Sequence, residues 1–148
     1  MEKEQNKANI DLRFANINVI KFSQFDLRKP FKKDVFPLIE FITKIEFRVL
    51  ELEKRLSCLI TVEMKLIETE EDFAEMKLET QFDVNPFSAI IKVDSINFQI
   101  PNALMQTVAS VSISTLRGVL YEKLKGTIAQ NDIYPLMNLA QFFPSIEK

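Results

Sequence analysis

The residues of this chain that can take part in chemistry are carboxylates, lysines, two tyrosines and one cysteine, Cys58. The sequence has no histidine, which removes the commonest general base, the histidine-containing catalytic triad and histidine ligands for zinc. Its only glycines are Gly118 and Gly126, so it has neither a Walker loop nor a GxGxxG dinucleotide fingerprint. No spacing of the remaining groups pairs an acid with a base. We expect a protein that is not an enzyme and uses no cofactor or metal.

Phenylalanine is the residue type in excess, with 13 rings against 2 tyrosines and no tryptophan. Most of these rings should pack in the core. Cys58, at an apolar position of an alternating stretch, should do the same rather than act as a nucleophile. The remaining rings can take part in non-covalent binding, by lining an apolar groove for a flexible partner. A pocket for a small ligand or a lipid is the alternative use of the same apolar surface.

Length and composition fit one domain, residues 10–148, preceded by a polar tail at residues 1–9. The 148 residues are 47% hydrophobic, and the formal net charge of -2 gives no electrostatic reason to expect nucleic acid as a partner. No apolar run approaches the roughly 20 residues that span a bilayer, and the charged N-terminus does not resemble a secretory signal. Together with a single cysteine, these features predict a cytoplasmic protein without membrane insertion.

Alternation of apolar and polar residues predicts four antiparallel strands. Residues 58–66 and 76–84 alternate clearly and should pair as a hairpin across the acidic turn ETEEDF. Residues 10–27 alternate with two changes of phase, which predicts one strand with bulges or two short strands. Residues 38–56 fit either a helix or a strand, and their β-branched and aromatic content favours a strand with a turn near residues 53–55.

Two helices are expected after the strands. The long one covers residues 103–125, begins after Pro101 and Asn102, and stops at Gly126. A short second helix or turn is expected near residues 136–143, and an apolar connector should precede the long helix. Strands in one run and helices in another predict an α+β fold, a four-stranded antiparallel sheet with one long and one short C-terminal helix on one face.

The long helix has small residues on a side of its own. Ser110, Ser114 and Gly118 recur every four residues and therefore share one face, away from the apolar stripe. A glycine inside a helix costs on the order of 1 kcal/mol relative to alanine. Either this face meets water, or it allows a second helix backbone to approach closely. We favour the second explanation, which predicts an interface between subunits at these three residues.

The order of elements and three C-terminal stretches resemble the SecB family of protein-export chaperones. The stretches are IPNALMQ, STLRGVLYEKLKGT and IYPLMNLAQFF, and the likeness in strand order extends from Ile10 to Phe143. They look more like the distant SecB-like proteins than like the export chaperone itself. The resemblance implies a homotetramer, a dimer of dimers, that holds unfolded chains in apolar grooves without ATP.

The resemblance also implies which segments form the grooves: the end of the first strand region, the loop after it, the connector and the last helix. The client-binding residues that correspond in this sequence are Phe22, Phe25, Leu27, Phe31, Phe36, Phe87, Ile90, Ile91, Leu136, Leu139, Phe142 and Phe143. Core packing is the competing role for several of them.

The partners implied by the resemblance are unfolded polypeptide clients, together with the export ATPase SecA or an antitoxin. Export chaperones of the family meet the translocase motor through acidic residues on the outer face of the sheet. Here Glu75 and Glu79 are the best candidates, but Lys65 and Lys77 interrupt the acidic patch. General export and a dedicated antitoxin client therefore remain alternatives.

Overall fold

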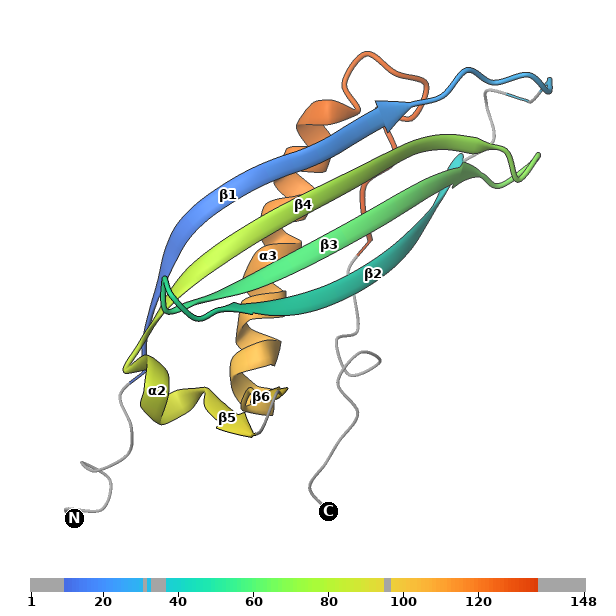
Figure 1. Ribbon diagram of the computed structural model, residues 1–148. Coiled ribbons are helices and arrows are strands. Elements are labelled where there is room, and N and C mark those ends of the chain that lie inside the picture. Colours follow the sequence, from blue (N-terminus) through green and yellow to red (C-terminus); the bar gives the residue numbers. More distant parts are fainter. Residues whose placement is uncertain (1–9, 31, 33–36, 95–96, 136–148) are drawn as a thin grey trace.

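The computed structural model describes residues 10–30, 32, 37–94 and 97–135, and all structural statements concern these residues. One antiparallel sheet has the strand order β1-β4-β3-β2, and a long helix lies on one of its faces (Figure 1). These elements are β1 (Asp11–Gln24), β2 (Ile39–Leu50), β3 (Arg55–Leu66), β4 (Asp72–Asn85) and α3 (Asn102–Lys123). The predicted α+β fold, with a four-stranded antiparallel sheet and a long helix after it, is confirmed.

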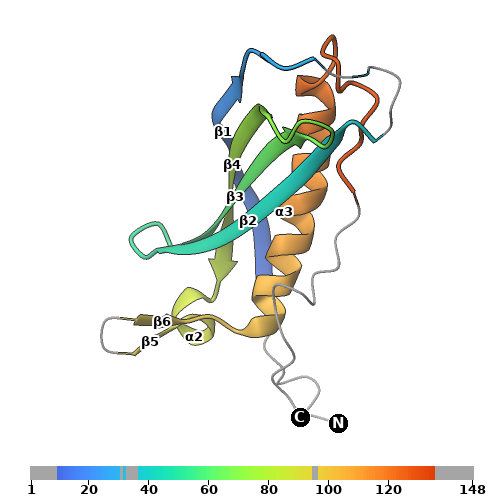
Figure 2. The same cartoon turned by 90° about the vertical axis from the view of Figure 1, so that its right-hand side faces the viewer.

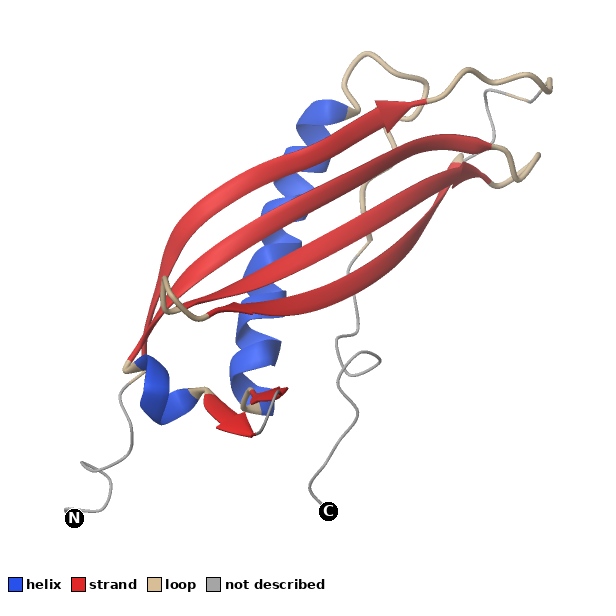
Figure 3. Ribbon diagram, in the orientation of Figure 1, coloured by secondary structure: helices blue, strands red, loops and turns tan. Residues whose placement is uncertain are grey.

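The connector between β4 and α3 contains structure of its own, which the sequence analysis did not predict. It forms a short helix, α2 (Phe87–Ile90), and a two-stranded ribbon of β5 (Lys92–Asp94) and β6 (Asn97–Gln99). Figure 3 shows α2 and the ribbon together at one end of the sheet, beside the start of α3. The short C-terminal helix expected near residues 136–143 lies outside the described residues.

The two phase changes predicted in the first strand are two bulges in a single strand of 14 residues. The pairing of β1 with β4 shifts between Phe14 and Asn16, and again between Val19 and Lys21. Each bulge inserts one residue and so returns the following apolar side chains to the same face. As a result Phe14, Ile17, Val19 and Phe22 all pair with β4 residues whose side chains point into the core.

The ambiguous segment after residue 38 is a strand, as its β-branched and aromatic content favoured. β2 pairs with β3 without a shift, from Ile39 opposite Leu66 to Leu50 opposite Arg55. The predicted turn between the two strands covers residues 51–54, and Lys54 takes a positive φ of 59° there. Alternate β2 residues, Phe41 and Ile45 among them, face the helix side of the sheet and pack against the core.

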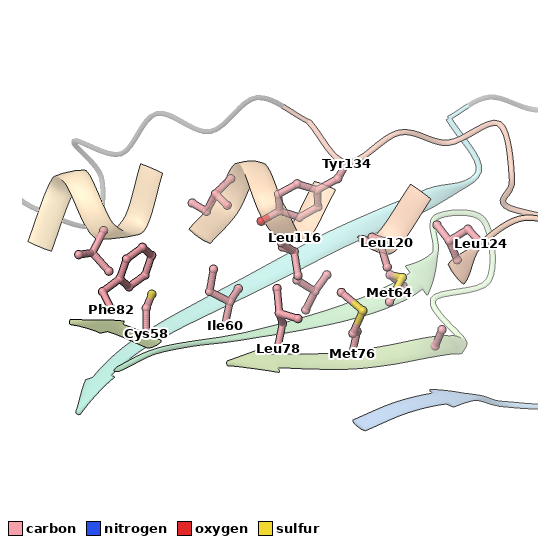
Figure 4. Packing of buried hydrophobic residues seen from close by; sticks show 14 of the residues in the cluster. Cys58, Ile60, Met64, Met76, Leu78, Phe82, Leu116, Leu120, Leu124 and Tyr134 are labelled. Atoms are coloured by element: carbon pink, nitrogen blue, oxygen red, sulfur yellow. The ribbon is translucent and has the colours of Figure 1, made fainter. Parts of the chain in front are cut away.

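The hydrophobic core lies between the sheet and α3, which runs along one face of the sheet (Figure 2). Close up, Ile60, Met64, Met76 and Leu78 point from β3 and β4 toward the leucines of the helix (Figure 4). The α3 residues buried there are Leu104, Val108, Ala109, Ser112, Ile113, Leu116 and Leu120. Each large aliphatic side chain buried in this way contributes roughly 1.5–3 kcal/mol. The helix ends at Lys123, two residues earlier than expected, and Gly126 follows with a φ of 82°.

By length and composition, α3 is the one described helix that could cross a membrane, with a mean hydropathy of 1.2 in its most apolar 18-residue window. The sequence analysis found no apolar run of that length, because serines and threonines interrupt the valines, leucines, isoleucines and alanines that give the helix this value. Buried residues make up 39% of that window, and the apolar ones pack against the sheet in the core.

A polar pair connects the helix to the sheet inside this core. The hydroxyl oxygens of Thr80 on β4 and Ser112 on α3 lie 2.6 Å apart, and both residues are fully buried. The Thr80 hydroxyl also lies 3.4 Å from the carbonyl oxygen of Cys58. Burial raises the pKa of Cys58 to about 11, and a hydrogen bond with Ser112 partly offsets the rise. The thiol is therefore protonated at neutral pH, in agreement with its predicted core role.

Removing one member of this pair is expected to destabilise the protein more than removing both. Thr80→Val leaves the Ser112 hydroxyl buried without its short hydrogen bond and should lower the free energy of unfolding by roughly 1–3 kcal/mol. Thr80→Val combined with Ser112→Ala removes both polar groups and should recover most of that loss. Denaturant unfolding of the two single variants and the double variant measures the coupling, and strictly additive losses would contradict it.

Candidate functional site

Two adjoining cavities open at the end of the sheet where β2 begins. The larger, of about 720 Å³, lies between the start of β2 and the segment that follows α3; it is lined by Pro37, Ile39, Glu40, Phe41, Ile67, Asn131, Asp132, Ile133 and Pro135. The smaller, of about 310 Å³, is lined by Lys32, Pro37, Leu38, Ile67 and Glu68. The two share Pro37 and Ile67, and we refer to them together as the groove.

Apolar side chains of the groove are open to solvent. Ile67, in the turn between β3 and β4, is 48% exposed, and Ile133, after α3, is 63% exposed. Single exposed apolar residues are ordinary, but these two line one cavity together with the half-buried Phe41. A polypeptide segment lying in the groove would remove this surface from water at about 25 cal/mol per Å² of apolar area.

The segment after α3 is fastened across β2 and forms one wall of the groove. The buried carboxylate of Asp132 accepts hydrogen bonds from the backbone amides of Leu38, at 2.8 Å, and Ile39, at 2.6 Å. The Tyr134 hydroxyl hydrogen-bonds with that of Thr43, and burial raises the pKa of this tyrosine. Its ring also meets Phe41 edge-on, with the ring centroids 5.4 Å apart. The wall is therefore fixed by polar and aromatic contacts before any ligand binds.

The client-binding residues expected at the end of the first strand lie beside this region without lining the groove. Phe22 and Leu27 are half-buried and pack against the core. Phe25 is 41% exposed, and its backbone amide donates to the Phe73 carbonyl at 2.8 Å. Among these three residues, only Phe25 offers an exposed ring.

The expected connector residues lie at the opposite end of the sheet. Phe87 and Ile91 are buried in the hydrophobic core at the end of β4, so the structure gives them a packing role. Ile90 is also buried and lines a separate cavity of about 490 Å³. The remaining expected client-binding residues lie outside the described residues: Phe31, Phe36, Leu136, Leu139, Phe142 and Phe143.

The small-residue face of α3 is open in this structure. Ser110, Ser114 and Gly118 are all exposed, and a Cβ atom built on Gly118 would meet nothing within 4 Å. On the same side of the sheet, Phe14, Ile17 and Val19 of the edge strand β1 are exposed apolar residues that the helix does not cover. The sequence analysis did not single out these three residues as surface.

The outer face of the sheet carries charges of both signs, and Glu75 and Glu79 have partners there. Glu75 forms an ion pair with Lys21 at 3.0 Å, and Glu79 accepts a hydrogen bond from the Ser57 hydroxyl at 2.7 Å. The solvent-exposed Lys21–Glu75 ion pair contributes about 0–1 kcal/mol. The two glutamates expected to meet a motor protein therefore lie among cross-strand contacts rather than in a continuous acidic patch.

The groove contains residues that sequence reasoning missed, above all Ile67, Ile133 and Asp132. The sequence signal for them is weak: an isoleucine next to an acidic turn, and an Asp-Ile-Tyr-Pro stretch after the long helix. Within the described part of the chain, no group of three or more potential metal-ligating side chains comes together.

Comparison with known proteins finds similarity in structure alone. No family model and no curated protein matches the sequence. The Rv1957 SecB-like chaperone of Mycobacterium tuberculosis, in complex with a ChAD peptide from the HigA1 antitoxin, aligns with a TM-score of 0.55 and 11% identity over 86% of this chain and 85% of that one. A Streptococcus agalactiae protein of unknown function aligns with a TM-score of 0.49 and 12% identity over 88% of this chain and 99% of that one.

The fold and the first of these likenesses define a distant SecB-like fold, as the sequence resemblance predicted. At 11% identity the likeness extends to the fold alone.

Proposed function

We propose that this chain is an ATP-independent holding chaperone that binds unfolded or nascent polypeptide segments in the groove. The observation that carries the proposal is the groove itself, an open and mainly apolar cavity with exposed isoleucines on walls that are already fixed. The fold shared with a chaperone solved in complex with an antitoxin peptide supports it. Reading apolarity rather than a motif suits a protein that must accept many sequences.

A dedicated client, such as an antitoxin, is the partner that we favour over the export ATPase SecA. The reason is the outer face of the sheet, where Glu75 and Glu79 are engaged with Lys21 and Ser57. A motor that recognises free acidic residues would have to break these contacts. We also propose that the protein is cytoplasmic, since export clients and a dedicated client would both be bound there as nascent chains.

We also propose that the chain assembles as a homotetramer, a dimer of dimers. Two open surfaces support this: the small-residue face of α3, and the uncovered apolar residues Phe14, Ile17 and Val19 of β1. Both would be removed from water by further copies of the chain.

The purified protein is expected to suppress aggregation of a chemically denatured test protein at near-stoichiometric ratios, with no nucleotide present. Light scattering measures the suppression, and adding ATP should leave it unchanged because binding is driven by apolar burial. Failure to suppress aggregation at any ratio would contradict the proposed function.

A pocket for a small ligand or a lipid is the second candidate function. Its support is the cavity volume of about 720 Å³, which lies in the range of small-molecule sites. The two functions differ in what copurifies with the protein. Native mass spectrometry would show one bound small molecule for the second function and heterogeneous polypeptide for the first.

A further inference from the structure

The side chains of the acidic turn between β3 and β4 hold three described residues of the connection between β1 and β2. The Glu71 carboxylate accepts two backbone hydrogen bonds, from the amide of Arg28 at 2.6 Å and from the amide of Lys29 at 3.1 Å. The Glu68 carboxylate accepts a third, from the amide of Lys32 at 3.0 Å. Hydrogen bonds to an ionised acceptor are stronger than those between neutral groups.

The same turn also forms part of the groove. Ile67, which lines both cavities together with Pro37, donates its backbone amide to the Leu38 carbonyl at 3.0 Å. Glu68 and Lys32, which are joined by the third hydrogen bond, both line the smaller cavity. The Glu68–Lys32 contact is therefore made at the wall of the smaller cavity, and the Glu71 contacts hold Arg28 and Lys29, which precede Lys32 in the chain.

We propose that Glu68 and Glu71 are positioning residues for polypeptide binding, because they hold Arg28, Lys29 and Lys32 of the β1–β2 connection against the β3–β4 turn, and Lys32 forms part of the groove wall. This inference rests on the proposed function. Residues 25–30 of the connection form no helix or strand, and the Phe25 amide, which donates to the Phe73 carbonyl, holds their start. A wall that is already ordered loses less conformational entropy when a client binds, and binding is tighter for that reason.

The surroundings of Glu71 keep its carboxylate ionised. The backbone hydrogen bond from Arg28 lowers the pKa of Glu71 most, and the Lys29 amide and the charges of Lys29 and Arg28 lower it further, against a smaller opposing effect of desolvation. On the turn itself Glu70 and Asp72 are also acidic, and Asp72 is paired with Lys65 at 3.7 Å. Because the pKa is depressed by folding, the contribution of Glu71 is complete above its ordinary value of 4.5 and is lost as pH falls through the lower folded value.

The first test follows the hydrogen bonds directly. In an NMR titration, the amide signals of Arg28 and Lys29 should shift together with a midpoint below 4.5 and stay constant from pH 5 to pH 8. Glu71→Gln should abolish this shared titration and speed hydrogen exchange at both amides. Amide signals of Arg28 and Lys29 that do not titrate with an acid midpoint would overturn the proposal.

The second test measures binding of a fluorescent, permanently unfolded polypeptide, reduced and carboxymethylated α-lactalbumin. Glu71→Gln should weaken binding about fivefold, mainly through faster dissociation. Glu70→Gln is the matched control, because it removes the same charge from the same turn without these hydrogen bonds, and it should bind like the wild type. Glu68→Gln, which changes the contact with Lys32, should give a smaller effect of the same sign.

The outcomes separate the two proposals. Tight binding by the wild type and equally tight binding by Glu71→Gln would overturn the positioning role and leave the proposed function standing. No binding by the wild type would overturn both. Thermal unfolding of each variant shows whether weaker binding comes from a destabilised fold. If Glu71→Gln is destabilised, the binding affinity of Glu68→Gln decides the result.

Discussion

Replacing both exposed isoleucines of the groove, Ile67→Asp with Ile133→Asp, is expected to abolish suppression of aggregation and to weaken binding of an unfolded polypeptide about 100-fold. Each isoleucine covered by a client contributes on the order of 1–2 kcal/mol of apolar burial. The aspartates also place short charged groups beside the carboxylates of Glu68 and Asp132, where a bound apolar segment would desolvate them. Fluorescence anisotropy with an unfolded probe gives the affinity, and light scattering gives the activity.

The fold should tolerate this change, since both side chains are about half exposed or more. We expect the midpoint of thermal unfolding to stay close to that of the wild type. Leu52→Asp provides the matched control: Leu52 is 94% exposed in the turn between β2 and β3, at the opposite end of the strands from Ile67. Equal losses in the control and the groove variant, or full activity in the groove variant, would remove the groove from the mechanism.

The sheet could be predicted from the sequence because its signal is local. In β3 and β4, Ile60, Val62, Met76 and Leu78 are separated by polar residues, and the structure buries each of the four. The two phase changes in β1 also had a local cause, since a bulge shifts the alternation by one residue. Strands have a repeat of two residues, and they can therefore be predicted from the sequence before any tertiary contact is known.

The groove could not be predicted in the same way, because distant segments create it. Asp132 binds the amides of Leu38 and Ile39 across 94 and 93 residues of sequence. Nothing local marks this aspartate as a fastening point. The phenylalanines pointed partly to other regions. Phe87 lies in the core, whereas the exposed isoleucines of the groove lie in the β3–β4 turn and in the segment after α3. The excess of phenylalanine indicates how much apolar side-chain surface the chain has. Tertiary contacts decide which part of that surface stays exposed to solvent.

The small-residue face of α3 leads to the second large effect, a change of assembly. Gly118→Leu is expected to lower the mass in solution from that of a tetramer, because a leucine there would separate two closely packed backbones. Ser114→Leu, one turn earlier on the same face, should do the same. Light scattering and sedimentation measure the mass. Within one protomer the new side chain has room, since nothing lies within 4 Å of a Cβ atom at residue 118.

Two further variants show whether packing between copies is the cause. Gly118→Ala should stabilise the isolated helix by about 1 kcal/mol, because alanine loses less backbone entropy than glycine and fits the helical conformation. Lys44→Leu adds a leucine to the exposed outer face of β2 and should leave the mass unchanged. If the face of Ser110, Ser114 and Gly118 met only water, Gly118→Leu would also leave the mass unchanged and would raise stability. An interface predicts a lower mass for Gly118→Leu, whereas a water-facing surface predicts an unchanged mass and a higher stability. Single substitutions therefore distinguish the two cases.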